Sequence, residues 1–129
     1  MTMKVLVVED SSTMRSLIAG TVEEIAGTKV FEAETGFEAL RILPKEQIDL
    51  IITDINMPDI NGLEIIHFVK TNPNYQQIPI IIVTTERGEE DRKKALALGA
   101  SEYITKPFNP EDLRRVVARI IKTRKMEPQ

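Results

Sequence analysis

Short apolar runs alternate with longer amphipathic segments along this chain, and the alternation leaves few folds open. The apolar runs are rich in Val and Ile with few polar interruptions, as is typical of strands buried on both faces of a parallel sheet. They cover residues 5–8, 30–33, 50–53, 80–83 and 103–105. The run at 30–33 is more mixed, so we expect it at an edge of the sheet.

Apolar residues recur at helical spacing between these runs, and residues typical of helix ends flank them. One predicted helix begins at Ser11 or Ser12 and ends near Gly27, and others cover residues 37–43, 63–71 and 89–98. A last one begins at Asn109-Pro110, where a cap residue and a proline precede two acids, as the positive end of a helix dipole favours.

This order of strands and helices predicts an α/β fold, (βα)5, with a parallel five-stranded sheet and helices on both faces. Five strands favour the flavodoxin-like three-layer sandwich with strand order 2-1-3-4-5. A closed eight-unit barrel would need about twice the length. We expect residues 1–125 to form one domain and residues 126–129 a short tail, with no output domain.

Composition excludes several classes of protein. Hydrophobic residues make up 42% of the chain, so it is not disordered, and without cysteine it has no disulfide or thiolate metal site. We expect a cytoplasmic protein, because the sequence has no signal peptide and no apolar stretch near the ~20 residues of a membrane helix. A net charge of −3 gives no footprint for direct nucleic-acid binding. The single histidine, His67, is read as a surface residue.

Polar side chains follow the predicted strands at the edge where such sheets bind ligands. They are Glu9 and Asp10 after the first strand, Asp54 after the third, Thr84 after the fourth and Lys106 after the fifth. Singly, each is more often a cap or a loop residue. Together, three carboxylates repel one another, so the site needs a cation or raised pKa values. Such oxygen ligands suit Mg²⁺, and a lysine suits phosphate.

These residues resemble the signature of response-regulator receiver domains of two-component signalling. The resemblance rests on four pieces in the right order: Glu9-Asp10, the stretch from Asp54-Ile55-Asn56-Met57-Pro58 to Gly62, Thr84, and Lys106-Pro107-Phe108. It covers nearly the whole chain, and the combination is specific although no single piece is.

The resemblance implies that Asp54 is the phosphoacceptor, whose carboxylate attacks phosphorus and becomes an acyl phosphate. Lys106 and Thr84 would contact the phosphoryl oxygens. It also implies a Mg²⁺ site, which could take Mn²⁺, made by Glu9, Asp10, Asp54 and the backbone carbonyl of Asn56, and a cis peptide bond before Pro107.

Tyr103 resembles the aromatic residue that turns inward when the threonine of the site moves toward the phosphoryl group. The face made by the fourth helix, fifth strand and fifth helix would then change shape. The alternative is that Tyr103 only packs at its strand, with its hydroxyl in water. Asn56, Glu86 and Tyr103 together resemble single-domain chemotaxis regulators, in which such polar residues promote dephosphorylation. Alternatively, Asn56 and Glu86 are solvated loop residues.

The partners implied are a histidine kinase or phosphotransfer protein as donor and an unidentified output protein. We expect a monomer, with a transient dimer in the phosphorylated state left open. Two alternatives stay open at this point. An aspartate-nucleophile phosphatase of haloacid-dehalogenase type would need a second Asp where Asn56 stands, and Asn cannot transfer a proton. An interaction module independent of phosphorylation would not need the intact set of site residues.

Overall fold

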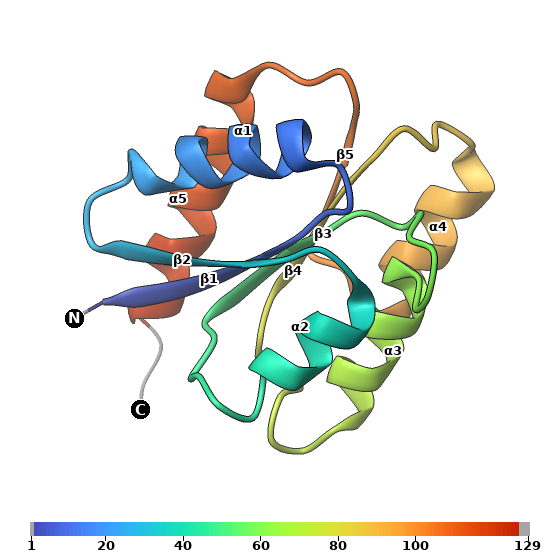
Figure 1. Cartoon of the computed structure of the whole chain (residues 1–129), viewed down its shortest axis with the longest axis horizontal. Coiled ribbons are helices and arrows are strands. Elements are labelled where there is room, and N and C mark those ends of the chain that lie inside the picture. Colours follow the sequence, from blue (N-terminus) through green and yellow to red (C-terminus); the bar gives the residue numbers. More distant parts are fainter. Residues whose placement is uncertain (1, 127–129) are drawn as a thin grey trace.

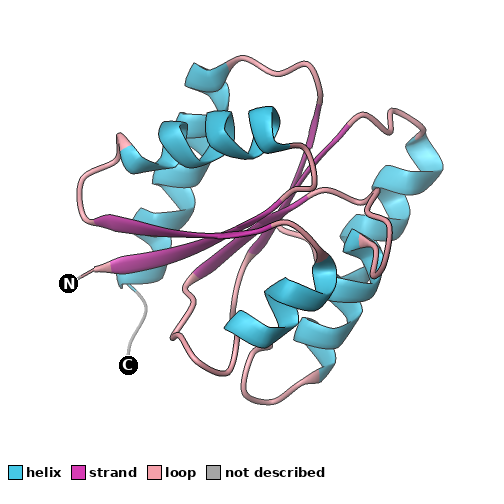
Figure 2. Cartoon of the chain, viewed as in Figure 1, coloured by secondary structure: helices cyan, strands magenta, loops and turns pink. Residues whose placement is uncertain are grey.

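All five predicted strands form one parallel sheet in the computed structural model, which describes the backbone of residues 2–126 and the side chains of residues 2–124 (Figures 1 and 2). The strands are β1 (Met3–Val8), β2 (Thr28–Ala33), β3 (Leu50–Thr53), β4 (Ile80–Thr84) and β5 (Glu102–Thr105). Their order is β2-β1-β3-β4-β5. The predicted order is therefore confirmed, as is the edge position of the mixed strand β2.

The helices are α1 (Ser12–Glu23), α2 (Gly36–Ile42), α3 (Gly62–Thr71), α4 (Glu89–Leu98) and α5 (Pro110–Met126). Ser11 caps α1, because its side chain accepts a 3.2 Å hydrogen bond from the Met14 N–H. Of the predicted tail, Met126 belongs to α5 and residues 127–129 lie outside the described residues.

The predicted end of α1 near Gly27 was wrong. The helix ends at Glu23, and Gly27 lies in the turn before β2 with φ of 84°. The Thr28 hydroxyl lies 3.0 Å from the Val22 carbonyl oxygen and 2.8 Å from that of Ile25. A side chain that satisfies these carbonyls offers an alternative to further helical bonds, so the helix stops early.

The two faces of the sheet carry separate hydrophobic cores. Along β1, Val5 and Val7 pack with α1 and α5, whereas Leu6 and Val8 pack with α2, α3 and α4. Figures 1 and 2 show the helices divided in this way between the two sides of the sheet. Because both faces of β1, β3 and β4 are buried, these three strands have no polar alternation, which explains their continuous apolar runs.

The carboxyl ends of the strands meet at one edge of the sheet. Val8 at the end of β1 pairs with Thr53 at the end of β3, and Thr84 at the end of β4 pairs with Thr105 at the end of β5. The residues that follow these strands are thus brought together. In the described part of the chain, no helix has the length and apolar character needed to cross a membrane.

Candidate functional site

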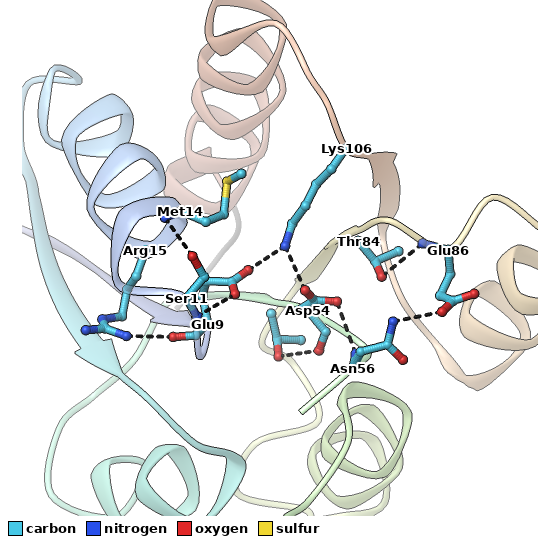
Figure 3. A network of polar contacts seen from close by, with 10 residues as sticks. Glu9, Ser11, Met14, Arg15, Asp54, Asn56, Thr84, Glu86 and Lys106 are labelled. Carbon is cyan, nitrogen blue, oxygen red and sulfur yellow. Dashed lines mark hydrogen bonds and ion pairs between the residues drawn. The ribbon is translucent and has the colours of Figure 1, made fainter. Parts of the chain in front are cut away.

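A buried ion-pair cluster lies at this edge, built from residues that follow three different strands (Figure 3). The Lys106 Nζ lies 2.7 Å from Glu9 Oε1 and 2.7 Å from Asp54 Oδ2. The side chains are only 11%, 2% and 8% exposed, respectively. One ammonium group therefore bridges two carboxylates that are 45 residues apart in the sequence, and it offsets part of their negative charge.

Burial and hydrogen bonding pull the pKa values of this cluster in opposite directions. Loss of hydration raises the pKa of Glu9 above its ordinary value, although hydrogen bonds from Lys106 and the Ser11 N–H counteract part of the effect. For Lys106, burial alone would lower the pKa, but its hydrogen bonds to Asp54 and Glu9 outweigh burial and raise it. Lys106 thus stays protonated at neutral pH.

The start of α1 holds Glu9 from two sides. The Ser11 N–H donates to Glu9 Oε2 over 2.9 Å, and Arg15 donates to the Glu9 carbonyl oxygen over 2.8 Å (Figure 3). Sequence reasoning did not identify Ser11 or Arg15 as part of the site. Their only signal is that they lie in the first turn after the acidic pair, which fits many helix starts equally well.

The second oxygen of the Asp54 carboxylate faces the loop that follows it. The Asn56 N–H donates to Asp54 Oδ1 over 3.1 Å, and the Asn56 side-chain amide donates to Glu86 Oε1 over 2.8 Å (Figure 3). Thr84 is fully buried, and its hydroxyl accepts a 3.3 Å hydrogen bond from the Glu86 N–H. The structure therefore brings together Asn56, Glu86, Thr84 and Asp54, which all belong to the predicted site.

The Tyr103 side chain is half-buried and its hydroxyl donates to the Glu86 carbonyl oxygen over 2.8 Å. Burial raises the pKa of this hydroxyl, and the nearby carboxylates of Asp91 and Glu86 add to the increase. The hydroxyl is thus hydrogen-bonded to the protein, a contact that neither reading of Tyr103 predicted. Tyr103 links β5 to the loop between β4 and α4.

The loop between β4 and α4 also contacts the residue that carries the ammonium group. Arg87, which sequence reasoning did not single out, donates to the Lys106 carbonyl oxygen over 2.7 Å. The peptide bond between Lys106 and Pro107 is cis, as the resemblance implied. No local pattern marks Arg87, because the contact joins residues 19 positions apart.

The expected cluster of three carboxylates is not formed in this arrangement. Asp10 is exposed, and within the described residues no three acidic or histidine side chains are grouped so as to hold a metal ion. The physical reason is that Lys106 already offsets the repulsion between Glu9 and Asp54, while the Asp10 carboxylate keeps its hydration. The carboxylate and carbonyl oxygens remain the kind of ligand that fits a hard divalent cation.

A doubly wound parallel sheet with a buried Asp after β3, a Thr ending β4 and a Lys after β5 is the arrangement of a receiver domain. The chain belongs to the response regulator receiver domain family, whose model matches residues 5–118. The predicted resemblance is thus confirmed.

Individual relatives narrow this to receiver domains of the CheY type. The chain is 44% identical over 122 residues to a chemotaxis protein CheY homolog of Campylobacter jejuni, covering 94% of each chain. It is 41% identical to chemotaxis protein CheY1 of Helicobacter pylori, covering 94% of this chain and 98% of that one. The solved structure of CheY4 of Vibrio cholerae superposes with a TM-score of 0.84 at 38% identity, covering 93% and 99% of the two chains.

Proposed function

We propose that this protein is a phosphorylation-dependent switch that accepts a phosphoryl group on Asp54 from a histidine kinase or a phosphotransfer protein. The observation that carries the proposal is the position of the Asp54 carboxylate, between the Lys106 ammonium and the Asn56 N–H at the sheet edge. Phosphoryl transfer depends mainly on positioning and on electrostatic stabilisation, and both are supplied here by fixed groups.

In the transfer step, an Asp54 oxygen attacks phosphorus and the bond to the donor breaks. Lys106 then pairs with a phosphoryl oxygen, and the Thr84 hydroxyl donates to another. Glu9, Asp10, Asp54 and the backbone carbonyl of Asn56 would hold Mg²⁺, or Mn²⁺ in its place. Such an ion, when bound, offsets negative charge on the transferring group.

The phosphoryl group is then removed by water within the same site. The Asn56 amide donates to the Glu86 carboxylate over 2.8 Å, so the two polar side chains lie together beside Asp54. We propose that this pair orients the attacking water and thereby sets the lifetime of the acyl phosphate.

The output is binding to another protein. Tyr103 links the site to β5 through the Glu86 carbonyl, so movement of Thr84 would alter the face formed by α4, β5 and α5. The relatives named as chemotaxis proteins make chemotaxis the candidate pathway. Residues 1–125 would act as one receiver domain in the cytoplasm, monomeric or transiently dimeric when phosphorylated.

Intact-protein mass spectrometry after incubation with Mg²⁺ and acetyl phosphate tests this function. We expect addition of one phosphoryl group, which is lost in Asp54→Asn. Asp49→Asn is the matched control, because Asp49 lies before β3 at the opposite edge, where it accepts from the Lys4 N–H over 2.9 Å. Undiminished labelling of Asp54→Asn would show that another residue accepts the phosphoryl group. A wild-type protein that is not labelled would contradict the proposed function.

A further inference from the structure

The loop that follows Asp54 is fastened at its far end to the first turn of α2. Asp59 lies near the tip of this loop, and its two carboxylate oxygens accept from two backbone N–H groups of α2. Oδ1 lies 3.1 Å from the Gly36 nitrogen, and Oδ2 lies 2.8 Å from the Phe37 nitrogen. These donors belong to the first turn, where an α-helix has no internal partners for its N–H groups. A carboxylate there also interacts favourably with the helix dipole.

Close backbone packing accompanies these two hydrogen bonds. A Cβ atom added to Gly36 would lie 2.5 Å from the Ile60 carbonyl oxygen. A glycine is thus needed for the loop and the helix to approach this closely. The hydrogen bond from Phe37 lowers the pKa of Asp59, so the carboxylate stays charged at neutral pH.

The same loop is closed at its base around the phosphoacceptor. The Gly62 N–H donates to the Ile55 carbonyl oxygen over 2.9 Å, and a Cβ at Gly62 would lie 2.2 Å from the Asp54 carbonyl oxygen. Asn56 donates its N–H to Asp54 within this loop. Because the loop is short, we expect a displacement of its tip to change the backbone at its base.

We infer that Asp59 is a positioning residue for phosphoryl transfer: by clamping the loop tip to α2, it holds the Asn56 backbone and the Asp54 carboxylate in their reactive arrangement. This inference rests on the function proposed above. The Asp59 carboxylate accepts from α2, and Asp59 is not among the residues proposed above to contact the phosphoryl group or the metal ion. Asp59 acts on Asn56 and Asp54 through the loop backbone, so α2 helps to hold the site in position.

Amide hydrogen exchange of the metal-free protein tests the clamp without reference to activity. In Asp59→Ala we expect exchange at Asn56 and Gly62 to accelerate by roughly tenfold, as for the loss of a net hydrogen bond. Asp59→Asn keeps one acceptor oxygen and should give an intermediate value. The rate of phosphorylation by acetyl phosphate at a fixed Mg²⁺ concentration should fall in the same order.

Thr35→Ala is the matched control, because the Thr35 hydroxyl also caps α2, accepting from the Glu38 N–H over 3.1 Å, and this hydrogen bond lies within the capped first turn of α2 and not between α2 and the loop. It should lower the melting temperature about as much as Asp59→Ala, yet leave loop exchange and phosphorylation rate unchanged. If Thr35→Ala reproduced both loop effects, or if Asp59→Ala changed neither, the clamp would be overturned. A wild-type protein that took up no phosphoryl group would instead overturn the proposed function.

Discussion

Lys106 shows at the scale of a single residue how the site balances its charges. Its ammonium lies 2.7 Å from a carboxylate oxygen of Glu9 and 2.7 Å from one of Asp54, and all three side chains are nearly buried. Removing one partner from such a cluster leaves charge that is both desolvated and uncompensated, which costs more than the pairing gains.

We therefore expect Lys106→Gln to lower the free energy of unfolding by about 3 kcal/mol in the absence of divalent ions. Urea unfolding at neutral pH in the presence of a chelator measures the change. Adding Asp54→Asn to this variant should restore part of the loss, because it removes one of the two unpaired carboxylates.

The control is Arg115→Gln. Arg115 pairs with Asp112 over 3.0 Å, but the two side chains are 70% and 60% exposed. Solvent screens such a pair, so we expect a change under about 0.5 kcal/mol. Equal stability of Lys106→Gln and wild type would mean that the two ion pairs make no net contribution to folding.

The residues of the site differ in how far the sequence revealed them. Glu9, Asp54 and Lys106 could be found because each directly follows a predicted strand, and such strand ends meet at one edge. The orientation of Asp10 toward solvent could not, because it depends on which carboxylates the lysine reaches. Arg87 carries no local signal at all.

At the scale of elements, the passage from β3 into α3 is tightly packed at Gly62. A Cβ at Gly62 would lie 2.2 Å from the carbonyl oxygen of Asp54, which belongs to the backbone and cannot rotate away. At Gly20 within α1, by contrast, a Cβ would meet no atom within 4 Å. The two positions make a matched pair of glycines.

Gly62→Ala should destabilise the protein by about 2–3 kcal/mol and slow phosphorylation, because the overlap displaces the backbone of Asp54. Gly20→Ala should stabilise it by about 0.5–1 kcal/mol, since alanine loses less entropy in a helix. Thermal unfolding of both variants with acetyl phosphate labelling checks the pair. Full labelling and unchanged stability of Gly62→Ala would show that the loop accommodates the added methyl group without displacing Asp54.

Helix boundaries were predictable where capping chemistry is local. Asn109 could be identified as the residue before α5, and its side chain accepts from the Glu111 N–H over 2.8 Å. The end of α1 was not predictable, because Thr28 of β2 satisfies the last carbonyls from outside the helix. A cap that comes from the following strand does not alter the periodicity of the helix sequence, so the helix end could not be recognised there.

At the scale of the whole molecule, the sheet separates two cores, and the site lies where the strands end between them. Glu9, Asp10 and Asp54 directly follow β1 and β3, the pair of strands at which the strand order switches. A cation bound there would link the residues that follow β1 to the residue that follows β3.

We expect Mg²⁺ to raise the thermal stability of the whole domain. At ten times its dissociation constant, binding to the folded state alone contributes roughly 1.4 kcal/mol. Melting curves with and without Mg²⁺, at ionic strength matched with NaCl, measure the shift. It should vanish on addition of a chelator and shrink in a Glu9→Gln, Asp54→Asn double variant. A shift of equal size in that variant would place the ion elsewhere.

The alternation of strands and helices and the polar residues that directly follow the strands could be read from the sequence, because periodicity and strand ends are local properties of the chain. The strand order could be predicted because a pattern of five such units favours one order. Only the tertiary structure decided that Lys106 bridges Glu9 and Asp54, that Asp10 faces solvent and that Asp59 fastens the Asp54 loop to α2. These contacts join residues far apart in the chain, and their geometry depends on how several elements pack at once.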